Sequence, residues 1–371
     1  MKKELLKIGF KPLTLLNKII KKDEKLIFFY SNLGFRDNVK AFYDYLIQNK
    51  YHENYRIVVS ANDYERFMEK EPEGVTFVGM KQGIRYFLKA KVAFFCFGKY
   101  PIKPAKKQMV VNLWHGTPLK KIGNLEKGCE KIDYDFFTKI LTTAPMYKPI
   151  MASIFGCKES QVEVMGNPRN DEMFVSNKLV DTAIRRGSRK VFLWLPTYRE
   201  YNPDFLISCL SKSDLEQLND YLKGVECRMI IKLHPLQQME EELKNYSYID
   251  FITEEQLQKQ KMTVYTLLRN ADALITDYSS VYFDYMLMDR PIAFAVEDIE
   301  EYGTKRGFVF DNPKEYMPGM EIKNINDVEK FISDTFNGVD PYEEQRREIN
   351  DRVNYYKDGD ACERIAKRFI R

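Results

Sequence analysis

Several features are scarce or missing in this 371-residue chain, and each absence excludes a class of protein. The net charge is only +4, with no cluster typical of a base-reading module, so we expect no nucleic-acid partner. No apolar run approaches the roughly 20 residues that a membrane-spanning helix needs. Phosphate loops, dinucleotide fingerprints, His-Glu-x-x-His motifs and nucleophile elbows are also missing. Nucleotide hydrolysis, hydride transfer and serine hydrolysis therefore lack their usual residues, and we expect neither a cofactor nor a metal site.

The six cysteines are too dispersed for a zinc site or a secreted disulfide framework. They are Cys96, Cys129, Cys157, Cys209, Cys227 and Cys362. We interpret them as small apolar side chains in a reducing cytoplasm. A hydrophobic content of 44% and a charged content of 30% indicate a folded globular protein, and the length allows two domains.

Positive charge is concentrated in residues 1–22, which contain seven lysines and one glutamate. This segment carries +6, so residues 23–371 sum to −2 (4 − 6). Leu13, Leu16 and Ile20 fall at helical spacing between the lysines, which predicts a basic amphipathic helix. The interrupting lysines argue against a signal peptide. We expect the helix to contact the anionic cytoplasmic face of a membrane; a solvated helix packed on its own domain is the alternative.

Short apolar strands alternate with helical patterns along most of the chain, which is typical of parallel sheets. The first half contains seven expected strands: Lys25–Phe29, Arg56–Ser60, Val75–Val78, Val92–Phe97, Val110–Trp114, Ile140–Thr143 and Val162–Met165. The second half contains five: Val191–Leu195, Arg228–Leu233, Tyr248–Ile252, Ala273–Thr276 and Pro291–Ala295. The polar stretch 176–190 is the best candidate for a linker. We therefore predict two Rossmann-like domains, 23–180 and 181–371, facing a central cleft.

Polar clusters follow five of these strands, where ligands bind in open parallel sheets. These exits carry His115 with Gly116, Thr117 and Lys120; Asn167 with Arg169; Thr197 with Arg199; Lys232 with His234; and Asp277 with Ser279 and Ser280. Turn chemistry alone does not explain five such clusters. The pattern therefore predicts a site to which both domains contribute.

The turn after Ala273–Thr276 is the strongest candidate for a phosphate seat. Asp277 ends the strand, and Ser279 and Ser280 open what the apolar spacing predicts to be a helix. A helix N-terminus offers free N–H donors and a partial positive charge to an anion. Asp284 lies one turn further and is a candidate to support a serine or bind a ribose hydroxyl. An ordinary first-turn acid is the alternative for Asp284.

Only three histidines are present, and two of them stand at strand exits, one in each half. Imidazole exchanges protons near neutral pH, so His115 and His234 are candidates for catalysis or phosphate contact. His52 lies in a polar turn, and we assign it no role. Arg169 and Arg199 can clamp a phosphate through two N–H groups, or serve as structural ion-pair partners.

Taken together, the motifs resemble the CDP-glycerol:poly(glycerophosphate) glycerophosphotransferase family of teichoic-acid and capsule biosynthesis. The resemblance covers about residues 25–370. It rests on Trp-His-Gly-Thr-Pro-Leu-Lys, Gly-Asn-Pro-Arg-Asn-Asp, Pro-Thr-Tyr-Arg, Lys-Leu-His-Pro and Thr-Asp-Tyr-Ser-Ser, in this order. It implies a GT-B fold, an acceptor domain (23–180), a CDP-alditol domain (181–371) and peripheral attachment to the cytoplasmic face of the cell membrane.

The resemblance also implies roles for the site residues. His115 would be the base that deprotonates the acceptor hydroxyl, and His234 would contact the donor pyrophosphate. The residues expected around the donor are Thr197, Arg199, Lys232, Asp277, Ser279, Ser280 and Asp284. Those expected on the acceptor side or in the cleft are Gly116, Thr117, Lys120, Asn167 and Arg169.

The expected reaction moves glycerol phosphate from CDP-glycerol to a hydroxyl of a lipid-linked saccharide or a polyol-phosphate polymer, and releases CMP. Transfer of ribitol phosphate from CDP-ribitol would use the same motifs. A GT-B glycosyltransferase that uses a nucleotide sugar is a further alternative. A binding protein with a decayed site is the non-enzyme alternative, and the intact His115, His234, Ser279 and Ser280 argue against it. The sequence does not distinguish the alditol or the acceptor.

Overall fold

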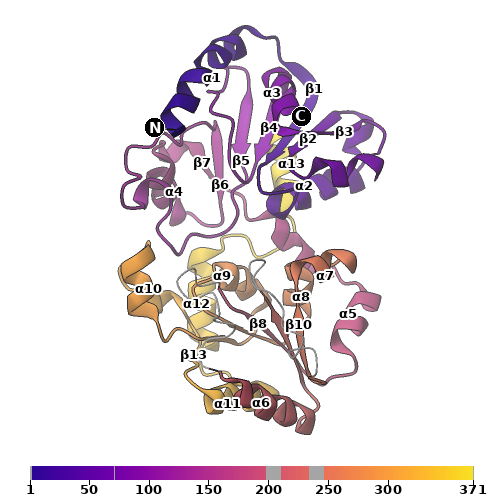
Figure 1. Cartoon of the computed structure of the whole chain (residues 1–371), viewed down its shortest axis with the longest axis vertical. Coiled ribbons are helices and arrows are strands. Elements are labelled where there is room, and N and C mark those ends of the chain that lie inside the picture. The colour runs from indigo at the N-terminus through magenta and orange to yellow at the C-terminus, as the bar shows by residue number, and fades with distance from the viewer. Residues whose placement is uncertain (1, 71, 198–209, 234–245, 371) are drawn as a thin grey trace. The chain divides into compact units, whose positions relative to one another are not determined.

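The computed structural model describes residues 2–70, 72–197, 210–233 and 246–370, and the chain divides into two compact units. The first unit contains Met1–Gly116, Ile122–Asp171 and Tyr355–Arg371. The second contains Thr117–Lys121 and Glu172–Asn354. Each unit is built on a parallel sheet with helices packed against it (Figure 1).

The first unit has a seven-stranded sheet in the order β3-β2-β1-β4-β5-β6-β7. The strands are β1 (Asp23–Ser31), β2 (Arg56–Ala61), β3 (Val75–Val78), β4 (Ala90–Phe95), β5 (Met109–Asn112), β6 (Lys139–Thr142) and β7 (Val162–Val164). Neighbouring strands pair in parallel throughout. Each overlaps a strand expected from the apolar runs, so all seven predictions for this half are confirmed.

Helices cover both faces of the first sheet. They are α1 (Lys2–Ile19), α2 (Asp37–Gln48), α3 (Met80–Lys89), α4 (Tyr147–Phe155) and α13 (Ala361–Phe369). Successive side chains of a strand point to opposite faces, which separates Phe28 from Phe29. The Phe29 ring packs against Phe42 of α2, and the Phe28 ring against Phe87 of α3, each with centroids 5.9 Å apart. Both apolar faces of the strand are therefore buried.

The second unit has a six-stranded parallel sheet in the order β10-β9-β8-β11-β12-β13. Its strands are β8 (Val191–Leu195), β9 (Arg228–Lys232), β10 (Ile249–Ile252), β11 (Ala273–Thr276), β12 (Ile292–Phe294) and β13 (Met320–Glu321). The five predicted strands of this half are confirmed. Strand β13 was not predicted, because two residues are too short to show a period.

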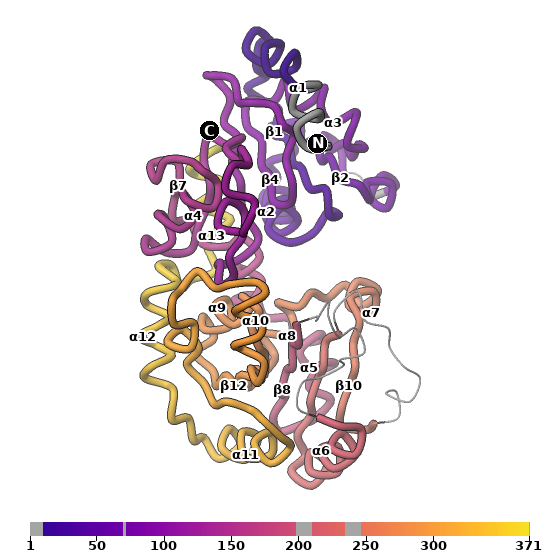
Figure 2. The backbone as a smooth tube through the Cα atoms, turned by 60° about the vertical axis from the view of Figure 1, so that its left-hand side comes forward, coloured from indigo at the N-terminus to yellow at the C-terminus, as the bar shows by residue number. Residues whose placement is uncertain are grey.

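Eight helices of the second unit lie in its described part: α5 (Lys178–Arg185), α6 (Lys212–Gly224), α7 (Glu254–Lys259), α8 (Val264–Asn270), α9 (Val281–Tyr285), α10 (Ile299–Arg306), α11 (Ile325–Phe336) and α12 (Glu343–Val353). Figure 2 shows α6 and α11 side by side. Leu218 of α6 and Ile332 of α11 share a core with Trp194 of β8. One face of the second sheet is buried under this helix pair.

The C-terminal residues belong to the first unit, whereas the sequence placed 181–371 in the second domain. Helix α13, yellow in Figure 1, begins where the N–H groups of Ala361 and Cys362 donate to the Asp171 carboxylate at 2.9 and 2.8 Å. Ile365 and Phe369 of this helix are buried in the core of the first sheet. The chain passes between the units after residues 116, 121, 171 and 354, not through one linker.

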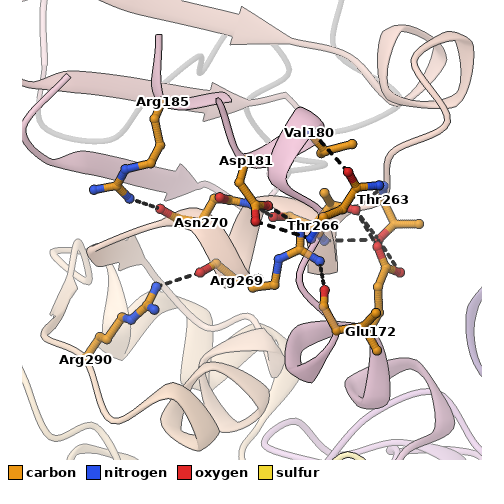
Figure 3. Close-up of polar contacts among 11 residues, drawn as sticks. Glu172, Val180, Asp181, Arg185, Thr263, Thr266, Arg269, Asn270 and Arg290 are labelled. Carbon is orange, nitrogen blue, oxygen red and sulfur yellow. Dashed lines mark hydrogen bonds and ion pairs between the residues drawn. The ribbon is translucent and has the colours of Figure 1, made fainter. Parts of the chain in front are cut away.

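The stretch 176–190, predicted as a linker, contains helix α5 instead (Figure 3). Asp181 of α5 accepts hydrogen bonds from Arg269 and, at 3.0 Å, from Asn270. Glu172 accepts hydrogen bonds from two threonines of the same neighbouring segment, Thr263 and Thr266. The linker prediction was wrong because Asp181 and Arg185, two of the charged residues of this stretch, make contacts to α8.

The predicted basic helix is present as α1, and its last turns are fixed to the first unit. Asn17 is fully buried, and its amide donates to the Lys103 carbonyl at 3.0 Å and the Gln108 side chain at 2.8 Å. The Lys22 ammonium donates to the Asn17 side chain at 2.6 Å and to the Leu88 carbonyl at 2.5 Å. Burial lowers the pKa of Lys22 to about 8. Part of the basic segment is therefore a structural element of its own unit.

Candidate active site

Three strand exits of the first unit are joined by one buried amide, that of Asn38. Its nitrogen donates to the carbonyls of Leu113 and Trp114, after β5, at 3.2 and 2.9 Å. Its oxygen accepts the backbone N–H of Arg169, after β7, at 3.1 Å. Asn38 itself lies after β1, near the start of α2. The loops that follow β1, β5 and β7 are thus held in a fixed relation.

Arg169 forms a buried ion pair in this cluster. Its Nη1 lies 2.8 Å from Oδ2 of Asp37 and donates to the backbone carbonyl of His115 at 2.9 Å. The Arg169 and Asp37 side chains are only 8% and 19% exposed. Of the two roles that the sequence left open for Arg169, the structure shows the ion-pair role. Its guanidinium also fixes the backbone that carries His115.

The His115 ring is half-buried between two aromatic side chains. Its centroid lies 4.0 Å from that of Trp114 and 4.9 Å from that of Phe97, with interplanar angles of 30° and 18°. Burial lowers the pKa of His115 to about 4, and Arg169 acts in the same direction, while the Asp37 carboxylate opposes both. At neutral pH the imidazole is therefore uncharged and able to accept a proton.

The backbone around His115 is strained. Trp114 and Asp37 have φ values of +58° and +60°, a left-handed conformation that is uncommon for residues other than glycine. The Trp114 carbonyl is held by the Asn38 amide and by the Cys96 thiol at 2.9 Å. Gly116, at φ +133°, follows directly. Such conformations persist where neighbouring contacts enforce them, which indicates a preorganised turn.

In the second unit, Asp277 joins the exits of two neighbouring strands, β8 and β11. Its buried carboxylate accepts the backbone N–H of Thr197 at 2.8 Å on one oxygen and the Thr197 hydroxyl on the other. Both residues were predicted to lie near the donor. The structure brings them together, with Asp277 positioning the turn that leads to Ser279.

The helix predicted after Ser280 is present as α9, with only five residues, Val281–Tyr285. Ser279 and Ser280 precede it and are partly exposed; Ser280 makes no side-chain cap, and Oγ of Ser279 accepts the Val281 N–H at 3.5 Å. Asp284 is fully buried and accepts a hydrogen bond from the Tyr265 hydroxyl at 3.4 Å. Its burial indicates a structural role in place of the predicted donor contact.

Thr117 and Lys120, predicted on the acceptor side, lie in the second unit. Residues 117–121, here called the strap, pair with residues 307–309 through an antiparallel bridge between Lys120 and Phe308. Two backbone hydrogen bonds flank the bridge, from Lys121 N to Gly307 O at 3.1 Å and from Val309 N to Leu119 O at 2.9 Å. The chain thus leaves the first unit immediately after Gly116.

The remaining predicted residues have varied environments. Arg199 and His234 lie outside the described residues. Lys232 ends β9 and forms an ion pair with Glu254 at 3.0 Å, and Asn167 is buried after β7. Within the described residues, no group of three or more His, Cys, Asp or Glu side chains is arranged to hold a metal ion.

Sequence reasoning missed Asp37 and Asn38. Both follow the carboxyl end of β1, as the other candidates follow their strands. Their place after a parallel strand is the same signal that points to His115 and Arg169.

Two parallel-sheet units with polar residues at their strand exits match the GT-B fold class. The solved structure of the wall teichoic acid polymerase TagF has the same fold, with a TM-score of 0.76 and 22% identity, over 99% of this chain and 96% of that one. A family model for CDP-glycerol:poly(glycerophosphate) glycerophosphotransferase matches residues 13–371, and the chain belongs to this family. The resemblance seen in the sequence is confirmed, and the protein is an enzyme of the glycerophosphotransferase class.

Two curated relatives show the extent of the similarity. The chain is 30% identical to the teichoic acid glycerol-phosphate primase of Bacillus subtilis (strain 168), over 70% of this chain and 67% of that one. It is 27% identical to the teichoic acid glycerol-phosphate transferase of Staphylococcus aureus (strain NCTC 8325 / PS 47), over 93% and 92%.

Proposed function

We propose that the protein transfers glycerol phosphate from CDP-glycerol to a hydroxyl of a lipid-linked saccharide or polyol-phosphate polymer, with release of CMP. The observation that carries the proposal is the uncharged imidazole of His115, held on a rigid turn in a member of this family. A neutral imidazole is the form that removes a proton from an alcohol.

In the proposed step, His115 takes the proton of the acceptor hydroxyl. The acceptor oxygen attacks the phosphorus that carries glycerol and forms the new P–O bond. The bond from this phosphorus to the bridging oxygen breaks, and its electron pair leaves with CMP. Phosphoryl transfer depends mainly on positioning and on stabilisation of charge, for which Ser279, Ser280 and, from the resemblance, Arg199 and His234 are the candidates.

CDP-ribitol is the alternative donor. A teichoic acid ribitol-phosphate polymerase of Staphylococcus aureus is 24% identical to this chain, over 72% of this chain but only 49% of its own length. The teichoic acid glycerol-phosphate transferase of the same organism matches larger shares of both chains, 93% and 92%. This difference favours glycerol, and donor competition tests it.

The test is turnover of CDP-glycerol, CDP-ribitol and UDP-sugars by the purified protein, with a lipid-linked disaccharide as acceptor. We expect CMP release from CDP-glycerol that depends on the acceptor. Faster turnover of CDP-ribitol would show that CDP-ribitol is the donor, and the reaction would remain transfer of an alditol phosphate. Turnover of a UDP-sugar alone would overturn the proposal.

We also propose that α1 rests on an anionic membrane surface at the cytoplasmic side. Leu15 and Ile19 are 65% and 79% exposed on this helix, and Leu16 is 40% exposed. The loop that binds Asn17 adds the exposed side chains of Lys106 and Lys107. Exposed apolar residues beside lysines suit the boundary between lipid headgroups and acyl chains. Among the described residues, no helix is long and apolar enough to cross a membrane.

The sharpest test of the membrane proposal is a double variant, Leu15→Glu with Ile19→Glu. It alters the exposed face and keeps Asn17 and Lys22, which a deletion of residues 1–22 would remove. We expect reduced flotation with phosphatidylglycerol vesicles, whereas Leu179→Glu, at a site 85% exposed in α5, should float like the unmodified protein. Equal flotation of all three proteins would refute the membrane contact.

A further inference from the structure

The second unit needs positive charge at the turn after β11 if it is to hold a diphosphate. Helix α9 has only five residues, so its dipole is weak. Asp277, at the start of the turn, adds a negative charge. Anionic phosphate groups are bound most strongly by charged donors such as lysine or arginine. A cation close to Ser279 would meet this need.

The strap places Lys120 beside Tyr302 of α10. The Lys120 ammonium lies 5.3 Å from the centroid of the Tyr302 ring. The Tyr302 ring in turn stacks on Tyr278, with centroids 4.2 Å apart and an interplanar angle of 24°. Tyr278 directly precedes Ser279 in the chain. Lys120 is therefore connected to the serine turn through one aromatic pair.

The aromatic support is rigid. Tyr278 and Tyr302 are 0% and 5% exposed, and the Phe308 ring lies 5.8 and 5.9 Å from theirs. The Tyr278 hydroxyl donates to Asp298 at 2.8 Å, just before α10. The Lys120 ammonium, which rests against these packed rings, is therefore held in place.

We propose that Lys120 binds the diphosphate of the CDP-alditol donor, with Tyr302 as the residue that positions it. The inference rests on the proposed function and moves Lys120 from the acceptor side to the donor side. It also gives a role to the strap, which follows His115 and Gly116 and is paired by backbone hydrogen bonds to residues 307–309 of the same unit.

The test compares Lys120→Met with Lys120→Arg, and uses Lys121→Met as the matched control in the same strap. Affinities for CDP and CMP are measured by calorimetry on the full chain. We expect Lys120→Met to weaken CDP binding by about tenfold or more, as is typical for a lost hydrogen bond between charged groups, and CMP binding by less. Lys120→Arg should retain most of the CDP affinity, and Lys121→Met should equal the unmodified protein.

A structural role of Lys120 would lower the affinities for CDP and CMP equally, so an unchanged CDP-to-CMP ratio in Lys120→Met would overturn the inference. Steady-state rates add a second readout: the KM for CDP-glycerol should rise while the KM for the acceptor stays constant. Tyr302→Leu should reproduce the CDP defect, and Tyr302→Phe, which keeps the ring, should not. If the unmodified protein binds CDP but does not cleave CDP-glycerol, the proposed function is overturned. The CDP and CMP affinities of the Lys120 variants would still decide whether Lys120 binds the diphosphate. Failure to bind CDP would overturn the inference.

Discussion

Within each unit, side chains link the loops that follow different strands, but the chemistry of the link differs between the two units. In the first unit, the ion pair of Asp37 with Arg169 does this, and its two charges cancel. In the second, Asp277 accepts two hydrogen bonds from the neutral Thr197. The first arrangement surrounds an uncharged imidazole, which suits the proposed deprotonation of an acceptor hydroxyl. In the second, Lys120 on the strap lies beside Tyr302, and we propose that it supplies the positive charge for an anionic donor.

The largest effect is expected on catalysis, from replacement of the uncharged imidazole of the first unit. We expect His115→Asn to lower kcat for CMP release by about 10²- to 10⁴-fold, the usual contribution of a general base. CDP affinity should not change, because the donor-side candidates lie in the other unit. His52→Asn is the control. A kcat unchanged in His115→Asn would remove the assignment of the base.

The next effect is on stability. Arg169→Met leaves the Asp37 carboxylate buried without its cation, and breaking a buried pair in this way costs about 3–5 kcal/mol. Urea unfolding measures this change. Arg368→Met, which breaks a half-exposed pair with Glu163, should cost less than about 1 kcal/mol. A small cost for Arg169→Met would show that the cluster is not the rigid support described above.

The pH dependence of stability isolates the buried imidazole. The pKa of His115 is lowered from 6.5 to about 4 in the folded protein, so between these values the unfolded chain binds more protons. The contribution of His115 is therefore complete above pH 6.5 and is lost as the pH falls toward 4. We expect the free energy of unfolding of the unmodified protein to fall by about 2 kcal/mol relative to His115→Asn between pH 6.5 and 4.5. Parallel pH profiles would show that His115 is not desolvated.

The smallest effect is expected on stability, from weakening the contact between Thr197 and Asp277 in the second unit. Thr197→Val removes the hydroxyl bond to Asp277 and keeps the backbone bond, so we expect a cost of about 1–2 kcal/mol in urea unfolding. Thr304→Val, at an exposed site in α10, should stay within about 0.5 kcal/mol of the unmodified protein. If Thr197→Val cost as much stability as Arg169→Met, the Thr197–Asp277 contact and the Asp37–Arg169 ion pair would be equally strong. The difference between the two units would then not hold.

Local pattern was enough to predict most of the sheet structure. Strands such as Val75–Val78, Val191–Leu195 and Ala273–Thr276 have the predicted bounds, because a buried parallel strand is a short continuous apolar run. The strand-exit rule likewise selected His115 and the serine turn. Polar composition was a poor guide at 176–190, because charged side chains such as Asp181 and Arg185 pair with distant residues and the sequence does not show such pairing.

The sequence by itself determined the two parallel sheets, the family and the loops that carry the candidate residues, because these depend on residues close together in the chain. Only the tertiary structure paired Asp37 with Arg169, which is 132 positions away. It also placed Lys120 beside Tyr302 and buried His115 enough to lower its pKa. Pairing, burial and charge balance depend on which distant segments pack together, and no local pattern records that.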